Sequence, residues 1–289
     1  FHTFVILPVE KRRFVMKLFA DLLRLMDLRM QTPTVFGWFH ILWLVLTATA
    51  AVGLCLWHKK HGSNPQKVLL WVSLFVILLE VYKQVNYSFS YEGGIGFDYQ
   101  WYAFPFQFCS TPMYVGLLAG LVKKGKFHDA LCAYLATFST FAGLCVMVYP
   151  GDVFISTIGI NIQTMICHGS MVMLGIYLLV SGYVKLEHKT ILKAMCVFSV
   201  AVTMAAVMNE IAHFSGLEET FNMFFVSRYF ESTLPVYGAV HNAVPFPLNL
   251  VIYILGFTLA SYIILLIAMG VHKIFVSGYS KTHNSRAIA

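Results

Sequence analysis

Charged residues are scarce in this sequence. Only 11% of its 289 residues are charged and 58% are hydrophobic, whereas soluble globular proteins have roughly 25% charged residues. This deficit excludes an ordinary soluble domain and predicts a membrane protein. Runs of about ten residues that alternate between apolar and polar, the pattern of an outer-membrane barrel, are also missing. A helical membrane protein is the class that remains.

The cysteines lack the spacings that bind metals or form disulfide frameworks. The six cysteines form no CxxC pair, and all of them fall within apolar runs. We therefore expect no disulfide, no metal and no cofactor, and most of the thiols should pack as small apolar groups. The net charge of +7 does not predict nucleic-acid binding, because the basic residues lie in short loops between apolar runs.

Seven stretches of this chain are long and apolar enough to cross a membrane, for which about 20 residues suffice. We predict an all-α polytopic bundle of seven transmembrane helices. The domain would cover residues 35–277, between an N-terminal segment, 1–34, and a cytoplasmic tail, 278–289. Its longest connection, 214–246, should fold over the mouth of the bundle as a capping loop. The predicted spans are 35–57, 67–90, 101–122, 127–149, 155–183, 190–213 and 247–275.

Lysines alternate between successive loops. They gather after the first, third and fifth spans and in the C-terminal tail, whereas the other connections carry almost no basic residue. The positive-inside rule then places the C-terminus in the cytosol and the N-terminus outside. The lysines of these three loops are Lys59, Lys60, Lys67, Lys123, Lys124, Lys126, Lys185, Lys189 and Lys193.

The N-terminal segment does not follow this rule. Residues 9–30 carry six basic residues on the side that the loop pattern places outside. Their apolar residues recur at helical spacing, so we expect an amphipathic helix that lies in the membrane interface. These apolar residues are Phe14, Leu18, Leu22, Leu25 and Leu28.

Several ionisable and amide side chains fall inside the predicted spans. An ionisable residue there costs roughly 2.5 to 3.5 kcal/mol and therefore needs a partner or a function. At about 1.5 Å per residue, all of them lie between the outer face and the centre of the bilayer, which fits one polar cavity open to the outer side. They are Glu80, Lys83, Gln84 and Tyr87 on the second span, Asn161, Thr164 and His168 on the fifth, and Asn209 on the sixth.

The stretch FQFCSTPMY, residues 106–114, adds a thiol at a similar depth. A neighbouring histidine is the commonest means of generating a thiolate, so Cys109 and His168 are the candidate nucleophile and base. Cys167 is adjacent to His168 in sequence, but successive helix residues point about 100° apart, which makes it a poorer partner. A cysteine and a histidine that are buried separately as packing residues remain the alternative.

The other polar groups would serve the substrate. Gln107 and Asn161 are expected to donate hydrogen bonds to a developing oxyanion. Glu80, Lys83 and Asn209 would contact the substrate within the same cavity. A self-neutralising ion pair between Glu80 and Lys83 is the structural explanation for those two residues.

At these residues the sequence resembles the YwaF-type integral membrane family and, more distantly, transmembrane protein 164. The matching segments run in order along most of the chain from residue 67 onward. They are EVYKQV (80–85), FQFCSTPMY (106–114), VMVYP (146–150), ICHGSMVMLGIYLL (166–179) and, more weakly, FNMFFVSRYFESTLPVYG (221–238).

This resemblance implies a seven-span lipid acyltransferase. An acyl chain would pass from a donor phospholipid to Cys109 as a thioester and then to the hydroxyl of a lysophospholipid, with His168 as general base. The sequence departs from transmembrane protein 164 at Ser110, where that protein has a histidine. Its acyl donor and acceptor are therefore not carried over.

Other functions stay open at this stage. The buried Glu80 and Lys83 also suit a transporter or channel, and the cavity would suit a protein that binds a lipid without turning it over. Water in place of the lipid acceptor would make the enzyme a hydrolase. Gly116 and Gly120 permit close helix packing, either inside the bundle or between subunits, so the sequence does not decide the oligomeric state.

Overall fold

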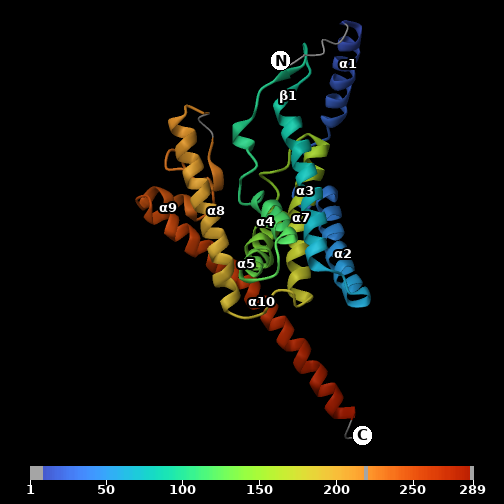
Figure 1. The fold of residues 1–289 in the computed structure, drawn as a ribbon, viewed down its shortest axis with the longest axis vertical. Coiled ribbons are helices and arrows are strands. Elements are labelled where there is room, and N and C mark those ends of the chain that lie inside the picture. The colour runs from blue at the N-terminus through green and yellow to red at the C-terminus, as the bar shows by residue number, and fades with distance from the viewer. Residues whose placement is uncertain (1–8, 218–220, 287–289) are drawn as a thin grey trace.

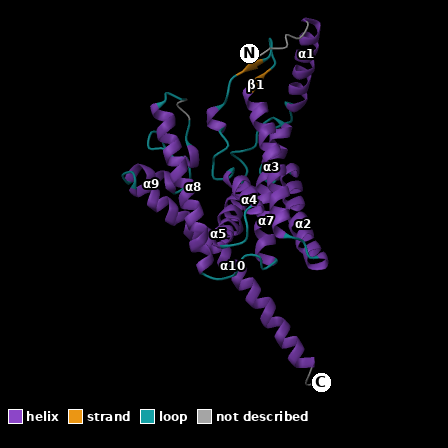
Figure 2. Cartoon of the chain, viewed as in Figure 1, coloured by secondary structure: helices purple, strands orange, loops and turns teal. Residues whose placement is uncertain are grey.

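The structure is a computed structural model that describes residues 9–217 and 221–286. The chain is mostly helical (Figures 1 and 2). Its α-helices are α1 (Val9–Met26), α2 (Trp38–His61), α3 (Pro65–Ser88), α4 (Thr111–Leu121), α5 (Lys126–Tyr134), α6 (Thr140–Val148), α7 (Ile158–Val180), α8 (Lys189–Phe214), α9 (Tyr237–Ala243) and α10 (Leu248–Arg286). The 3₁₀ turns η1 (Trp101–Ala103) and η3 (Met223–Phe225), the π-helix η2 (Leu135–Ser139) and the hairpin β1 (Phe89–Ser90) and β2 (Gly96–Phe97) complete the described elements.

Six helices of the described chain are long and apolar enough to cross a membrane. They begin and end within a few residues of six predicted spans, because apolar composition over about 20 residues largely determines a membrane helix. One of the six is a composite of α5, η2 and α6, in which a π-helical segment joins two α-helices. The chain is therefore a multi-pass integral membrane protein.

The prediction of a continuous helix over 101–122 is wrong. Only Thr111–Leu121, 11 residues, is helical there apart from the short turn η1, and a helix of that length does not cross a bilayer alone. Pro105 and Pro112 explain the interruption, since proline removes a backbone donor and is tolerated only in the first turn of a helix. Pro112 occupies the first turn of α4. The irregular segment before it is half-buried. Gln84 Nε2 donates to its Ala103 oxygen at 2.8 Å, which satisfies part of the freed backbone.

The lysine-bearing connections lie at one end of the bundle. Gln66 Nε2 donates to the backbone oxygen of Val122 at 2.8 Å, which joins the first of these loops to the second. Lys124 Nζ lies 5.2 Å from the centroid of the Tyr183 ring, which joins the second to the third. The hairpin lies at the opposite end (Figure 1), and so does the connection before α7, whose Thr157 pairs with Arg29.

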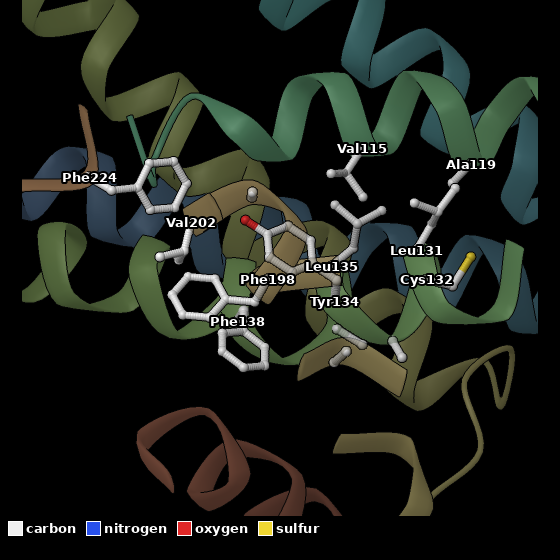
Figure 3. Close-up of a cluster of buried hydrophobic side chains, with 14 of the residues drawn as sticks. Val115, Ala119, Leu131, Cys132, Tyr134, Leu135, Phe138, Phe198, Val202 and Phe224 are labelled. Carbon is white, nitrogen blue, oxygen red and sulfur yellow. The ribbon is translucent and has the colours of Figure 1, made fainter. Parts of the chain in front are cut away.

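Aromatic side chains from α5, η2, α8 and the capping segment meet in the core, together with aliphatic side chains such as Val115 of α4 (Figure 3). The Phe138 and Phe198 rings stack with centroids 4.5 Å apart, and Phe224 reaches them from the capping segment with its centroid 6.1 Å from that of Phe198. All three rings are fully buried. This packing fixes the capping segment on the bundle, and segment 214–246 includes η3 and α9.

The two glycines of α4 serve packing within the chain. A Cβ at Gly116 would lie 2.3 Å from Ser73 Oγ, and one at Gly120 would lie 2.8 Å from the Cα of Leu70. Both neighbours belong to α3, so the small residues let α3 and α4 approach closely.

Both terminal helices extend from the bundle (Figure 1). The predicted N-terminal helix exists as α1, and the apolar residues expected on one face, including Phe14, Leu18 and Leu25, are exposed. Its position in a membrane interface stays a prediction. Residues 278–286, expected as part of a tail, continue α10, which ends at Arg286.

Candidate functional site

Cys109 lies in the turn that leads into α4. The backbone oxygen of Gln107 closes this turn by accepting hydrogen bonds from the amides of Ser110 and Thr111, each at 3.0 Å. The Thr111 hydroxyl donates to the same oxygen at 2.8 Å. These bonds hold the thiol at the point where the irregular segment becomes a helix.

A cavity of about 260 Å³ brings together several of the residues singled out in the sequence, among them Tyr87, Thr164 and Cys167. It lies between α3, α7, the start of α4 and the connection before α7. Glu80, Lys83, Cys109 and His168 all line it. The thiol and the imidazole therefore border one space, although 59 positions separate them along the chain.

His168 has one free ring nitrogen in this cavity. Its Nδ1 lies 2.8 Å from the backbone oxygen of Thr164; since a carbonyl only accepts, this nitrogen carries the proton. Its Nε2 is buried without a hydrogen-bond partner among the described residues. The ring thus presents an unshared lone pair, the form that a general base requires.

A charged network forms another part of the cavity wall. Lys83 Nζ lies 2.8 Å from Glu80 Oε1, so the ion pair considered from the sequence is present. Gln84 Nε2 donates to the same oxygen at 2.8 Å, and Gln163 Nε2 reaches Glu80 Oε2 at 3.4 Å from α7. The network connects α3 to α7 and leaves the ammonium of Lys83 at the cavity wall.

Cys167 also borders the cavity. Gln163 Nε2 donates to its sulfur at 3.3 Å. Helix geometry turns Cys167 away from the adjacent ring of His168, but it does not turn the thiol away from the cavity. The site therefore holds two thiols, and only Cys109 lies in a turn rather than within a helix.

The three amides predicted to contact substrate do not line this cavity. Gln107 is bonded through both ends of its side chain to the capping segment, with Nε2 3.0 Å from the Asn222 oxygen and Oε1 2.8 Å from the Phe224 amide. Asn209 bonds the backbone of Met223 in the same two-ended way, at 3.0 and 2.7 Å. These two amides attach the capping segment to the bundle.

Asn161 has a comparable structural task. It bonds both the amide and the oxygen of Ile155, at 2.9 and 2.7 Å. It thereby holds the connection that precedes α7. The side-chain amides of both Asn161 and Gln107 are therefore already hydrogen-bonded to backbone groups.

A second, polar cavity of about 460 Å³ adjoins the first and was not anticipated. The two share Tyr87, Tyr102 and Ile155 in their linings. The Tyr91 hydroxyl donates to Asp27 Oδ2 at 3.0 Å in this outer cavity, and that hydrogen bond raises the pKa of Tyr91. Its lining comes from α1, the end of α3 and the hairpin. The sequence did not predict that these elements lie close together.

One further thiol and imidazole pair lies away from these cavities. The Cys132 sulfur is 3.6 Å from His128 Nε2 on α5. Their spacing of four residues is visible in the sequence and could have identified the pair. Within residues 9–217 and 221–286, no three His, Cys, Asp or Glu side chains are grouped so that they could hold a metal ion.

Comparison with known proteins identifies the family. No curated protein and no solved structure matches the chain. Residues 35–269 match the TMEM164 family. This range includes five of the six membrane-spanning helices in full and most of the sixth, whose spanning part ends at Ile274. The resemblance to transmembrane protein 164 is thereby confirmed, and the chain belongs to the TMEM164 family.

Proposed function

We propose that this protein is an integral membrane acyltransferase that moves a fatty acyl chain from a donor phospholipid to a lysophospholipid. The observation that carries this proposal is the free Nε2 of His168 in the cavity that Cys109 also lines. Covalent acyl transfer requires at least a thiol and a base that border the same space. Membership of the TMEM164 family supports it.

In the first step the Cys109 sulfur attacks the ester carbonyl of the donor while His168 Nε2 accepts the thiol proton. Collapse of the tetrahedral intermediate breaks the ester C–O bond and forms the thioester. The departing glycerol oxygen takes the proton from His168 and leaves as a lysophospholipid. The hydrogen bond from Nδ1 to Thr164 holds the ring in the required tautomer, as a carboxylate does in a catalytic triad.

In the second step the hydroxyl of an acceptor lysophospholipid attacks the thioester. His168 Nε2 accepts the hydroxyl proton and returns it to the departing sulfur of Cys109, which restores the resting enzyme. An apolar surrounding disfavours water as the competing acceptor. A smaller cavity that Cys109 and Cys167 share is lined mainly by side chains such as Val72, Met171 and Leu174, which favours transfer over hydrolysis.

Lys83 is the group best placed to stabilise negative charge in these steps. Its ammonium borders the cavity beside Glu80. A fixed cation in a site shielded from water stabilises a developing oxyanion or a substrate phosphate strongly. Lys83 takes the role that the sequence suggested for Gln107 and Asn161, whose hydrogen bonds are used elsewhere.

The lysine-bearing loops support a membrane orientation. They gather at the end away from the hairpin, and positive-inside reasoning assigns that end to the cytosol. The residues of the cavity that lie outside the α-helices, Tyr102 and Asp152 among them, lie toward the hairpin end. We propose that the cavity faces the outer side and that the substrates are lipids of that leaflet.

The test is transfer of a labelled acyl chain between lipids in liposomes that contain the purified protein. Cys109→Ser should abolish transfer, whereas Cys145→Ser, at an exposed cysteine outside the cavity, should leave it unchanged. Equal rates for the two variants would refute the proposal. Solute flux that survives Cys109→Ser would favour a transporter, and a bound lipid that stays intact with acceptor present would favour a lipid-binding protein.

A further inference from the structure

An apolar groove runs along the outer side of the candidate site. Its volume is about 330 Å³, and it lies between α3 and the segment from the hairpin to the start of α4. Its lining includes Ile77, Val81, Val85 and Tyr114. Val81 is 53% exposed, so the groove opens on a surface that faces lipid in a membrane-spanning protein.

The groove and the catalytic cavity share a wall. Glu80 and Met113 line both spaces. A ligand in the groove would therefore be separated from the space around Cys109 by single side chains. Methionine is flexible and adapts to the shape of its neighbours, so Met113 is a suitable element of that wall.

Ser88 provides an independent indication of a ligand. Its side chain is 4% exposed, borders the groove, and leaves Oγ without a hydrogen-bond partner among the described residues. A buried hydroxyl without a partner is costly. Ser88 lies at the hairpin end of α3, about 16 Å along the helix from Ile77 at 1.5 Å per residue.

We propose that this groove is the loading site for a membrane glycerolipid. Its glycerol ester accepts a hydrogen bond from Ser88 at the hairpin end, and one acyl chain lies along α3 toward Met113. The polar end of the groove then lies at the outer end of the bundle, and its apolar end lies deeper in the membrane. A lipid of the outer leaflet has the same orientation, with its polar part outside and its acyl chains deeper. The claim that this lipid then moves to the cavity of Cys109 rests on the proposed function. The claim that it binds in the groove does not.

The experiment uses the full chain in phosphatidylcholine vesicles that contain a lipid with a photoreactive acyl chain. Labelled peptides are identified by mass spectrometry after irradiation. We expect label on α3 and α4 at the groove. Val81→Trp, which fills the groove, should reduce this label roughly tenfold. Leu78→Trp is the matched control, since Leu78 is exposed on the same helix but outside the groove.

Ser88→Ala should reduce the label by roughly two- to tenfold, as expected for one hydrogen bond. Equal labelling of the Val81→Trp and Leu78→Trp variants, at matched melting temperatures, would overturn the inference. Crosslinks across the groove between two copies of the chain would also overturn it.

Cys109→Ala should label as the wild type does. Groove labelling without any acyl transfer would therefore refute the proposed function alone, and transfer without groove labelling would refute this inference alone.

Discussion

Replacing Glu80 by glutamine removes the charge opposite Lys83 while it preserves the shape of the side chain. In the wild type, Glu80 accepts from Lys83 and Gln84 at 2.8 Å each and from Gln163 at 3.4 Å. Glutamine can still accept from amides. The specific consequence of the change is therefore an ammonium group at Lys83 without its counter-charge.

Burial determines the size of the effect. The side chains of Glu80 and Lys83 are only 8% and 18% exposed, so solvent screens the pair weakly. Removing one member of such a buried pair costs about 3 to 5 kcal/mol. At about 2 to 4 °C per kcal/mol, the melting temperature should fall by about 6 to 20 °C.

Thermal unfolding in detergent measures this loss, and the chain supplies a matched control. Lys193 and Glu187 form an exposed pair at 3.9 Å, with side chains 40% and 44% exposed. Glu187→Gln should therefore cost at most about 1 kcal/mol. Adding Lys83→Met to Glu80→Gln should restore most of the stability, because neither buried charge remains. Equal melting shifts for Glu80→Gln and Glu187→Gln, or no recovery in the double variant, would refute this reasoning.

Three further predictions concern the base, the cap and the helix packing. His168→Gln should lower acyl transfer by about 10²- to 10⁴-fold with little change in melting temperature; a folded variant with wild-type transfer rates would remove His168 from the mechanism. Gln107→Ala should lower the free energy of unfolding by about 1 to 3 kcal/mol through lost bonds to the capping segment, and an unchanged denaturation curve would contradict that role. Gly120→Val should prevent folding or lower the melting temperature markedly, because a Cβ there meets the α3 backbone, whereas Gly256→Val meets open space; similar yields and melting temperatures for the two variants would count against the α3–α4 contact.

The sequence was most informative where composition determines structure. Six of the long apolar runs are membrane-spanning helices in the structure, because about 20 consecutive apolar residues are nearly sufficient to define such a helix. The face of α3 with Glu80, Lys83 and Tyr87 was also readable, since helical spacing aligns these residues. They do line the same cavity as His168.

The sequence did not predict hydrogen bonds between a side chain and the backbone of a distant segment. Gln107 bonds to Asn222 and Phe224, more than a hundred positions away, and no local pattern reports such a bond. An amide inside a span therefore predicted a substrate contact, whereas in the structure both ends of this side chain bond to the capping segment. The prediction of the third span failed for a local reason, because Pro105 and Pro112 interrupt the helix although the stretch is apolar enough to span.

The covalent intermediate is the central claim, and its detection on the wild-type protein tests it most directly. The protein is incubated with a phospholipid that carries a labelled acyl chain, without acceptor, and its cysteine-containing peptides are analysed by mass spectrometry. We predict the acyl mass on Cys109, its removal by hydroxylamine or by an added lysophospholipid, and its absence in Cys109→Ala. Protein that is active in transfer but carries no acyl group on Cys109, or carries it on Cys167 instead, would contradict the mechanism.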